Sequence, residues 1–406
     1  MNDKPTKGKA ESAEPAKTRG EGFKGLLGGT VLVAFLLALS WATWNALPDI
    51  TEMSATRDTQ RSFLERIELP DGYKINLYAS GLGRARGMTV APNGDILVVS
   101  PGRKLFRVKA DSDGDGHSDG VETLRDDLKS PHGVLLDGDR LYVAETDGVV
   151  RFPYNPNEGQ ITGEREVVAS GFPTGSGYWT RTIKKGPNGW FYVTIGASCN
   201  SCIEDHPWRA AMIRFQPNQQ PEVYATGLRN SVGFDWQPGT GALYGIDVGT
   251  NWLGDDFPPD EVNLIEKDGF YGWPYFNGDN VANPDFADQA KGLAEKATKP
   301  VHAIEPHSSP LSILFLRHAK TPDLANAALA VRHGSWNRRT RVGFDIISLH
   351  WDDDGVISTR PFLTGFDTEG EVSGRPVGII ETDDGTLFLS DDFSGVIWRI
   401  SYQASS

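Results

Sequence analysis

The sequence predicts an all-β fold, a six-bladed β-propeller, preceded by an N-terminal transmembrane helix. Three observations lead to this prediction. A strand–turn–strand phrase occurs six times in the 406 residues, and residues 25–48 contain no charged side chain. Each copy of the phrase alternates apolar positions around a turn rich in Gly, Pro, Asn or Asp. Strand pairs that recur every 40 to 50 residues or so (about one blade) are typical of propellers.

The N-terminal region is expected to hold a leader and a membrane anchor. Residues 1–24 are polar, low in complexity and rich in Lys, which predicts a disordered cytoplasmic leader. Residues 25–48 are long enough to span the bilayer as a helix. A cleaved signal sequence is the alternative interpretation. Both interpretations place the remaining chain on the periplasmic side of the inner membrane.

The copies of the repeated phrase define the blades of one domain over residues 65–402. They are aligned on residues 87, 133, 182, 233, 312 and 378. A further strand is expected after each copy, at 104–110, 148–154, 211–217, 261–267, 344–351 and 395–402. An outer strand is expected before each copy, at 75–82, 121–128, 166–172, 222–228, 301–306 and 360–366. The strand at 75–82 should therefore complete the last blade and close the ring, which leaves no open sheet edge.

Two other segments have a predicted place in this arrangement. Residues 268–299 are expected to form an excursion between the fourth and fifth blades, helical in part. Cys199 and Cys202 are the only cysteines. In an exported protein such a pair most often forms a local disulfide, and free redox-active thiols or a metal site are the alternatives. The formal charge of −14 argues against nucleic acid as a partner.

In a propeller, the segments that lead into the inner strands meet around the axis on one face. Here these segments carry a basic set, with Tyr178 and Arg338 close by: Arg86, His132, Arg181, Arg229, His307 and Arg375. Each arginine alone could simply pair with an acid. As a set they predict a pocket for a planar polyanion, because guanidinium groups bind carboxylates bidentately and stack on flat rings.

Several motifs together resemble the glucose/sorbosone dehydrogenase family over about residues 70–402. They are GLRNSVGF (227–234), DDFPPDEVNLI (255–265), FYGWP (270–274), HGSWNR (333–338) and GRPVG (374–378). Members of this family are six-bladed propellers that use pyrroloquinoline quinone (PQQ) and calcium.

The resemblance implies roles for individual residues. Arg229 and Asn230 would contact the quinone and carboxylate region of PQQ, and Arg338 and Arg375 would bind its carboxylates. Arg181 and His307 are assigned to the same cofactor site from their axial positions. The turn that contains Gly249 and Thr250 would hold calcium through backbone carbonyls.

One position departs from the family pattern. The family's general base is a histidine just before the third inner strand, where this chain has Tyr178. An unperturbed tyrosine titrates near pH 10, which is too high for an efficient base at neutral pH. Either neighbouring charges lower the pKa of Tyr178, or another axial histidine replaces it. We expect His132 to do so, with His307 as the second choice.

A second calcium site is predicted in the first blade. Residues 111–122 match the twelve-residue calcium loop, whose alternating oxygen ligands surround one ion and whose central glycine permits a sharp turn. The expected ligands are Asp111, Asp113, Asp115, His117, Asp119 and Glu122. A solvated acidic turn without a metal is the alternative.

Taken with the resemblance, the sequence predicts a PQQ-dependent enzyme that oxidises a sugar at C1. The hydride would pass to calcium-polarised PQQ, and the electrons would then pass to a cytochrome or a membrane quinone. Two alternatives stay open at this point. One is a calcium-dependent lactonase, and the other is a propeller that binds its ligand without catalysis.

Overall fold

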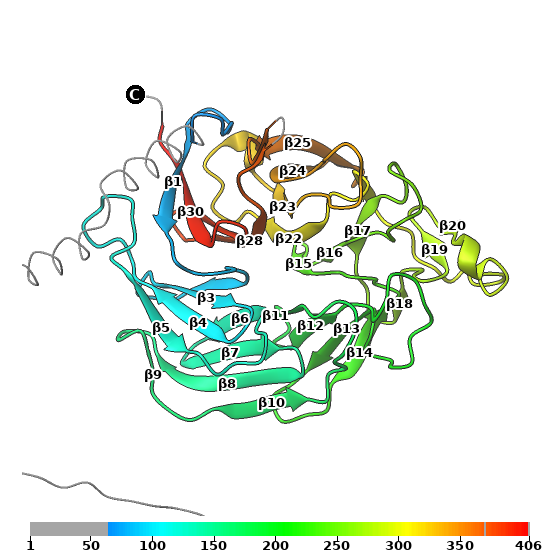
Figure 1. Cartoon of the computed structure of the whole chain (residues 1–406), viewed down its shortest axis with the longest axis horizontal. Helices are drawn as coiled ribbons and strands as arrows, with labels where there is room; N and C mark the ends of the chain where they lie inside the picture. Colours follow the sequence, from blue (N-terminus) through cyan, green and yellow to red (C-terminus); the bar gives the residue numbers. More distant parts are fainter. Residues whose placement is uncertain (1–63, 369–370, 405–406) are drawn as a thin grey trace, which may run out of the picture. The chain divides into compact units, whose positions relative to one another are not determined.

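The computed structural model of the protein describes residues 64–368 and 371–404. Within them, six sheets of four or five strands stand around a common centre (Figure 1). The predicted six-bladed propeller is therefore confirmed. The predicted leader (1–24) and transmembrane segment (25–48) lie outside the described residues. None of the helices in the described part of the chain has the length and apolarity that a membrane crossing requires.

Each blade is an antiparallel sheet whose first strand faces the axis. The innermost strands are β2 (Met88–Val90), β6 (Gly133–Asp137), β11 (Arg181–Lys185), β15 (Gly233–Trp236), β22 (Pro310–Phe315) and β28 (Pro376–Glu381). The second strands are β3 (Ile96–Ser100), β7 (Arg140–Glu145), β12 (Phe191–Ile195), β16 (Leu243–Asp247), β23 (Ala328–Arg332) and β29 (Leu387–Asp391). Strands β3, β12, β16 and β29 are buried along their whole length, because neighbouring blades cover both of their faces.

The third and outer strands complete the blades. The third strands are β4 (Lys104–Val108), β8 (Gly148–Asn155), β13 (Ala211–Phe215), β17 (Asp260–Leu264), β24 (Asp345–Trp351) and β30 (Val396–Tyr402). The outer strands are β5 (Val121–Arg125), β10 (Glu166–Ser170), β14 (Glu222–Thr226), β21 (His302–Ile304), β25 (Ile357–Leu363) and β1 (Tyr73–Ala79). All twelve correspond to strands predicted from the sequence.

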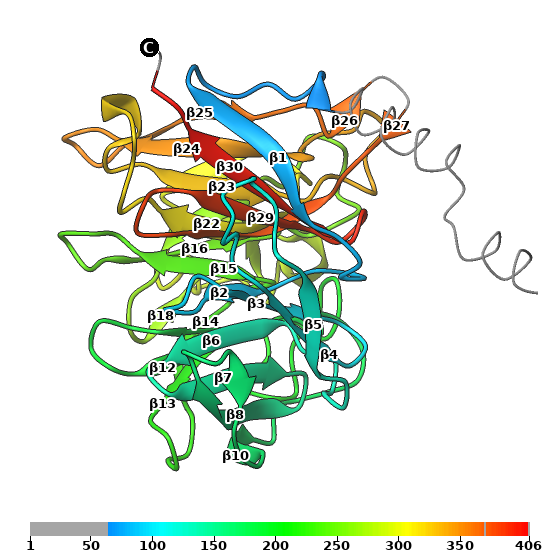
Figure 2. The same ribbon diagram turned by 90° about the vertical axis from the view of Figure 1, so that its left-hand side faces the viewer.

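The ring closes through the first strand, as predicted. Strand β1 pairs antiparallel with β30, with Tyr73 opposite Tyr402 (Figure 2). The last blade therefore combines both ends of the described chain. Between neighbouring blades the apolar side chains interdigitate: Ile246 and Val262 of the fourth blade pack with Ile313 and Phe315 of the fifth. The core is thus a series of layers between blades, and it holds the axial segments in fixed positions.

The excursion at 268–299 attaches to the third and fourth blades. Strand β18 (Gly269–Phe270) adds to the third blade parallel to β14. It is followed by a hairpin of β19 (Phe276–Asn277) and β20 (Val281–Ala282). The helical part expected here is a single 3-10 turn, η1 (Pro284–Phe286). Three short strands lie elsewhere at the edges, β9 (Gln160–Ile161), β26 (Asp367–Thr368) and β27 (Glu371–Val372).

The glycine that recurs at the inner strands has a structural reason. A Cβ added to Gly133 would lie 2.6 Å from the carbonyl oxygen of Arg181, and one added to Gly233 would lie 2.6 Å from the Cα of Ser312. Both contacts are with the next inner strand, so the inner strands come close together only where no side chain intervenes.

The change Gly133→Ala is expected to destabilise the propeller by about 1–3 kcal/mol. The added Cβ would contact backbone atoms of the next inner strand, and backbone atoms shift less readily than a side chain does. The free energy of unfolding from denaturant titration measures this effect. Gly378→Ala is the matched variant, since its added Cβ meets its nearest atom at 2.9 Å and should cost less. Equal stability of Gly133→Ala and the wild type would contradict the explanation.

Candidate active site on the propeller axis

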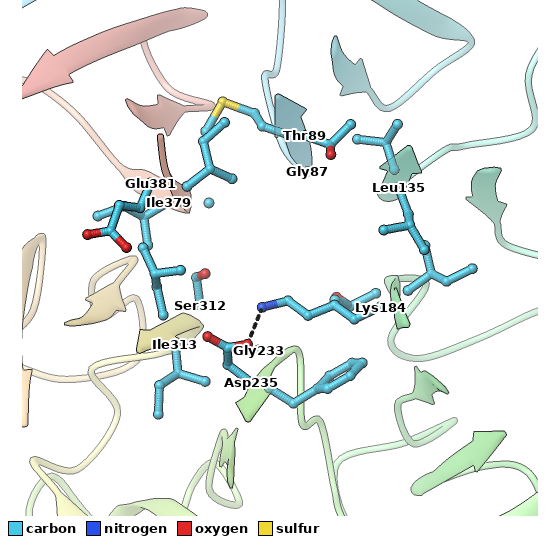
Figure 3. Close-up of a pocket in the computed structure, with 18 of the residues that line it drawn as sticks. Gly87, Thr89, Leu135, Lys184, Gly233, Asp235, Ser312, Ile313, Ile379 and Glu381 are labelled. Atoms are coloured by element: carbon cyan, nitrogen blue, oxygen red, sulfur yellow. Dashed lines mark ion pairs between the residues drawn. The ribbon is translucent and has the colours of Figure 1, made fainter. Parts of the chain in front are cut away.

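A cavity of about 440 Å³ runs along the axis and is lined by residues of all six inner strands. Figure 3 shows Lys184 reaching across this cavity toward Asp235 of the next blade, at an N–O distance of 3.5 Å. Arg317 also donates to both carboxylate oxygens of Asp235, at 3.0 and 3.1 Å. This ion-pair group lies toward the C-terminal ends of β11 and β15. The candidate residues lie at the opposite end, where the inner strands begin.

One part of the candidate site is a buried group centred on Asp392. Arg86 donates to this carboxylate, and His333 Nε2 lies 2.9 Å from its Oδ1. Burial would raise the pKa of Asp392, but the hydrogen bond from His333 and the charge of Arg86 outweigh burial and lower the pKa to about 2. Arg375 donates to the backbone carbonyls of His333 and Gly334, at 3.2 and 2.7 Å. The charge of Arg86 is therefore balanced by an acid that sequence reasoning did not single out.

His132 lies beside this group. Its Nδ1 is 3.4 Å from Thr182 Oγ1, while its Nε2 has no hydrogen-bond partner among the described residues. Trp179 packs edge-on against the imidazole at 5.6 Å between ring centroids, and the Arg86 guanidinium lies 5.6 Å from the Trp179 ring. Burial, and secondly the charge of Arg86, lowers the pKa of His132 to about 3. The imidazole is therefore neutral at physiological pH and has one free nitrogen.

The environment of Tyr178 raises its pKa, whereas a catalytic tyrosine base would need a lowered pKa. The Arg229 guanidinium lies 4.9 Å from the centre of the Tyr178 ring. Burial nevertheless raises the pKa of Tyr178, and the charge of Arg229 only partly opposes this effect. The protein's own side chains therefore do not lower the pKa of Tyr178, and the first of the two alternatives is wrong as far as these side chains are concerned.

Arg229 is fixed by Asn200, which lies between the two cysteines. Its Nε donates to the Asn200 backbone carbonyl at 3.0 Å, its Nη2 to Asn200 Oδ1 at 2.8 Å, and its Nη1 to the Val248 carbonyl at 2.9 Å. Cys199 and Cys202 form a disulfide, in agreement with the preferred prediction. Asn230 is buried next to Arg229, and its backbone N–H donates to Asp247 at 2.6 Å. The disulfide loop thus positions a candidate cofactor-binding residue, a role the sequence did not reveal.

Removing this disulfide with the double change Cys199→Ser and Cys202→Ser is expected to destabilise the protein by about 2 kcal/mol, the chain-entropy value for so short a loop. Because Asn200 would lose its fixed position, we also expect PQQ affinity to fall about tenfold, or about 1.4 kcal/mol. Isothermal titration with PQQ measures the affinity. Unchanged affinity in the folded double variant would show that the loop does not position Arg229.

Arg181 is a correction to the predicted cofactor set. Its side chain has no exposed surface. It donates to the backbone carbonyls of Pro173, Tyr178 and Thr180 at 2.7, 3.1 and 2.8 Å. Burial lowers the pKa of Arg181 to about 9. Through these hydrogen bonds the guanidinium stabilises the Tyr178–Trp179 loop, and it has no exposed surface with which to contact a cofactor.

His307 and Arg338 both hold the loop that follows the fourth blade's second strand. His307 Nε2 lies 2.7 Å from the Gly254 carbonyl oxygen. Arg338 donates to the Pro306 carbonyl at 3.1 Å and to Asp256 at 3.0 Å. His307 is buried, and Arg338 is partly buried. In the structure, His307 and Arg338 therefore connect their own loops to the loop that follows the fourth blade's second strand.

The predicted calcium turn at Gly249 and Thr250 lies among buried carboxylates. A small cavity of about 20 Å³ is lined by Gly249 and Thr250 together with Asp247 and Glu261. Thr250 Oγ1 is buried there without a hydrogen-bond partner among the described residues. The Gly249 N–H donates to Asp260 at 2.8 Å. Oxygen-rich surroundings and an unpartnered hydroxyl fit a hard cation such as calcium.

Burial raises the pKa of all three carboxylates in this region. The pKa is about 7 for Asp247 and about 6 for Asp260. For Glu261, burial and the charge of Asp247 raise the pKa to about 8. Such shifts mean that the anionic forms lack enough positive charge around them. Sequence reasoning named the turn but missed these three acids, although all three lie within or near the quoted motifs.

The predicted calcium loop of the first blade is only partly assembled. Ligand atoms of Asp111, Asp113 and Asp115 lie within 4.8 Å of one another. Asp119 instead accepts from Ser112, and His117 is exposed. Glu122 accepts from Gln160 at 3.1 Å and lies 3.6 Å from Arg107. Asp119 and Glu122 thus have other partners in this structure, and the three aspartates are the part of the predicted ligand set that it brings together.

Together, these features define a six-bladed propeller with a buried polar and aromatic site at one end of its axis. The TrAA12-like family model matches residues 67–268 and 278–403, and the glucose/sorbosone dehydrogenase model matches residues 208–333. The chain belongs to the TrAA12-like family, and the glucose/sorbosone dehydrogenase match agrees with the family that its motifs predicted.

Two relatives illustrate the range of sequence similarity. The chain is 28% identical to an uncharacterized protein of Borreliella burgdorferi, over 83% of this chain and 91% of that protein. It is 25% identical to the pyrroloquinoline quinone-dependent pyranose dehydrogenase of Coprinopsis cinerea. That match covers 82% of this chain but only 54% of the fungal enzyme.

Solved structures share the fold. The Trichoderma reesei family AA12 structure has a TM-score of 0.73 at 22% identity, covering 83% of this chain and 98% of that one. The holo PQQ domain of the Coprinopsis cinerea pyranose dehydrogenase has a TM-score of 0.70 at 21% identity, covering 82% and 97%. PQQ-bound aldose sugar dehydrogenase from Streptomyces coelicolor has a TM-score of 0.59 at 19% identity, covering 82% and 99%. These likenesses establish the propeller architecture.

Proposed function

We propose that the protein is a PQQ-dependent dehydrogenase that oxidises a sugar at its C1 hydroxyl. The observation that carries this proposal is the arrangement around His132, whose Nε2 is buried without a hydrogen-bond partner among the described residues and whose ring packs against Trp179, itself beside Arg86. Each of two consecutive aromatic residues, Tyr178 and Trp179, is accompanied by a guanidinium group. Flat aromatic and guanidinium surfaces suit a planar tricarboxylate such as PQQ. The Coprinopsis cinerea relative, named as a PQQ-dependent enzyme, supports the same cofactor.

The residues that would hold PQQ are Arg229 and Asn230 on one side and Arg375 on the other, with Arg86 and His333 beside Arg375. Arg338 and His307 would act less directly, by fastening the loop at 249–258. The turn at Gly249 and Thr250, with the buried acids beside it, would hold calcium. When bound, PQQ supplies the group that accepts a hydride, and calcium would polarise its carbonyl.

His132 would remove the proton from the sugar hydroxyl. Its Nδ1 would donate to Thr182 Oγ1, which leaves Nε2 as the acceptor. The low pKa of His132 makes it a weak base in the protein alone. Proton transfer to Nε2 would therefore depend on a substrate hydroxyl that becomes more acidic as the hydride leaves the C1 carbon to which it is attached.

A second candidate function is a propeller that binds its ligand without turnover. The raised pKa of Tyr178 and the low pKa of His132 favour it, since neither group is a strong base at neutral pH. Adding PQQ and calcium to the purified protein distinguishes the two functions. Sugar-dependent reduction of a dye, abolished by His132→Gln, supports the dehydrogenase. Tight PQQ uptake with no turnover on any aldose supports the binding propeller and would overturn the dehydrogenase.

The remaining expectations are part of this proposal. The disulfide supports export to an oxidising compartment, and we propose a periplasmic location with an N-terminal membrane anchor at 25–48. A cytochrome or a membrane quinone would then accept the electrons. The aspartate loop at 111–115 would bind a second, structural calcium ion, whose removal by a chelator should not alter PQQ affinity.

A further inference from the structure

Two exposed tryptophan side chains lie in contact near the candidate site. Trp252 is 68% exposed and Trp336 is 59% exposed. Their ring centroids are 5.2 Å apart and their planes are nearly perpendicular, at 85°. They come from the loops that follow β16 and β23, in the fourth and fifth blades. Single exposed apolar residues are common, but contiguous exposed apolar surface rimmed by polar residues often marks a binding site.

The two rings are held in place by the polar residues that precede and follow them. Asn337 Nδ2 donates to Asn251 Oδ1 at 2.9 Å, which joins the two loops directly beside the rings. Trp252 itself has a φ of 72°, a left-handed conformation that a residue with a side chain adopts only under constraint. Arg339 also donates to Asp255, at 3.1 Å. The outward position of the rings is therefore built into the loops.

This tryptophan pair is connected to the candidate site through Asn251. The Asn251 N–H donates to Asn200 Oδ1 at 2.9 Å, and its carbonyl accepts from Asn200 Nδ2 at 3.1 Å. Asn200 in turn accepts two hydrogen bonds from Arg229. The pair thus stands at the mouth of the site, one hydrogen-bonded residue away from the group that holds Arg229.

We propose that Trp252 and Trp336 form a stacking platform for a pyranose ring of the substrate, a saccharide. The inference rests on the proposed function. The C–H faces of a pyranose are apolar and pack on an indole face, while its equatorial hydroxyls project sideways and need polar partners. Arg339 and Asp255, in the same two loops as the rings, provide such partners. Two perpendicular indoles form a corner that can contact one sugar face and one sugar edge together.

A protein partner fits this surface less well. A specific protein interface buries at least about 1,000 Å² in total and has an apolar centre. Here the two rings are flanked by charged residues, since Arg339 and Asp256 are exposed next to them. The exposed apolar area is therefore the size of a sugar and too small for the centre of a stable protein interface.

The test is the quenching of tryptophan fluorescence by D-glucose, cellobiose and maltose, measured on the PQQ-free and the PQQ-loaded protein. We expect saturable quenching in the wild type and at least tenfold weaker saccharide binding in Trp336→Ala and Trp252→Ala, where binding is measured by isothermal titration calorimetry because the substitutions remove the reporting tryptophans. In the loaded enzyme the same changes should raise KM about tenfold and leave kcat within about twofold. Trp190→Phe is the matched control, because Trp190 lies in the turn after β11, near Arg214, at the opposite end of the blade. It should leave saccharide binding unchanged.

The outcomes separate this inference from the proposed function. Saccharide binding that is unaffected by both substitutions, or no quenching by any of the three sugars, would overturn the platform even if PQQ binds. Saccharide quenching without any PQQ uptake would overturn the proposed cofactor and leave the platform standing. Loss of docking to a protein electron acceptor in Trp336→Ala, with saccharide binding intact, would show that the pair serves a protein partner instead. Trp336→Phe keeps a ring in place, and its partial recovery of binding would exclude misfolding as the cause.

Discussion

Replacing Arg229 with methionine is expected to weaken PQQ binding at least 100-fold, or about 2.7 kcal/mol. Arg229 stacks on Tyr178 and joins the disulfide loop to Val248, in the turn that contains Gly249 and Thr250, through three hydrogen bonds. Methionine keeps much of the side-chain volume but removes the charge, and it leaves the buried oxygens of Asn200 and Val248 without donors. Titration of the purified variant with PQQ, followed by quinone absorbance, gives the affinity.

Arg214→Met is the matched control for this change. Arg214 also stacks on aromatic rings, at 4.4 Å from Trp190 and 5.2 Å from Tyr224, and it pairs with Glu222. It belongs to β13 of the same blade but lies away from the axial residues, so PQQ affinity should stay within about twofold. Arg229→Lys should recover only part of the affinity, because an ammonium group cannot form the same planar set of hydrogen bonds. A folded Arg229→Met protein with wild-type affinity would remove Arg229 from the cofactor site.

The architecture could be predicted from the sequence because a propeller repeats a local pattern. The alternation of apolar residues, the turn residues and the glycine found at four of the six inner strands all arise within one blade, so each appears as a short motif. Ring closure followed as well, since one strand remained before the first copy and the last blade lacked one. The pairing of Tyr73 with Tyr402 agrees with that count.

The environment of each site residue could not be predicted in the same way. The repeat places Arg86, Arg181 and Arg229 in equivalent connecting segments, yet the first pairs with Asp392, the second donates to carbonyls and is fully buried, and the third stacks on Tyr178. The contact that each arginine makes depends on the direction of its side chain and on partners up to 306 residues away in the sequence. A repeat pattern describes the backbone and carries no information about those partners.

The same limit explains the acids that the sequence did not single out. Asp247, Asp260 and Glu261 look like ordinary strand-end carboxylates, and only the burial of the two aspartates and the half-buried position of Glu261 beside the loop at 249–258 distinguish them. Conversely, the loop at 111–122 has the full calcium-loop spacing, but Glu122 belongs to β5 and is held near Arg107 by the sheet. Spacing alone therefore named more ligands in the loop at 111–122 than the structure brings together, and it named none of the acids that line the cavity beside Gly249 and Thr250.

The stabilisation of the protein by calcium is expected to increase as the pH rises from 5 to 8. The pKa values of Asp247, Asp260 and Glu261 in the folded protein are about 7, 6 and 8, above their ordinary values of 3.8, 3.8 and 4.5. A raised carboxylate pKa favours the protonated folded state at low pH, so without metal these groups destabilise the protein progressively between about pH 4 and pH 8. Calcium needs the ionised carboxylates and must displace those protons, so it binds weakly at pH 5 and tightly at pH 8.

Denaturant unfolding in excess calcium and in chelator, at several pH values, measures this effect. At pH 8, with calcium about 100-fold above its dissociation constant, the gain should be about 3 kcal/mol, and it should fall below about 1 kcal/mol at pH 5. Glu261→Gln should lose most of the pH-dependent gain, because it removes a half-buried acid of raised pKa that lines the cavity beside Gly249 and Thr250. Glu222→Gln, which removes a half-exposed acid of β14, should retain the gain. A calcium effect of equal size at pH 5 and pH 8, or one that survives Glu261→Gln, would place the ion elsewhere in the protein.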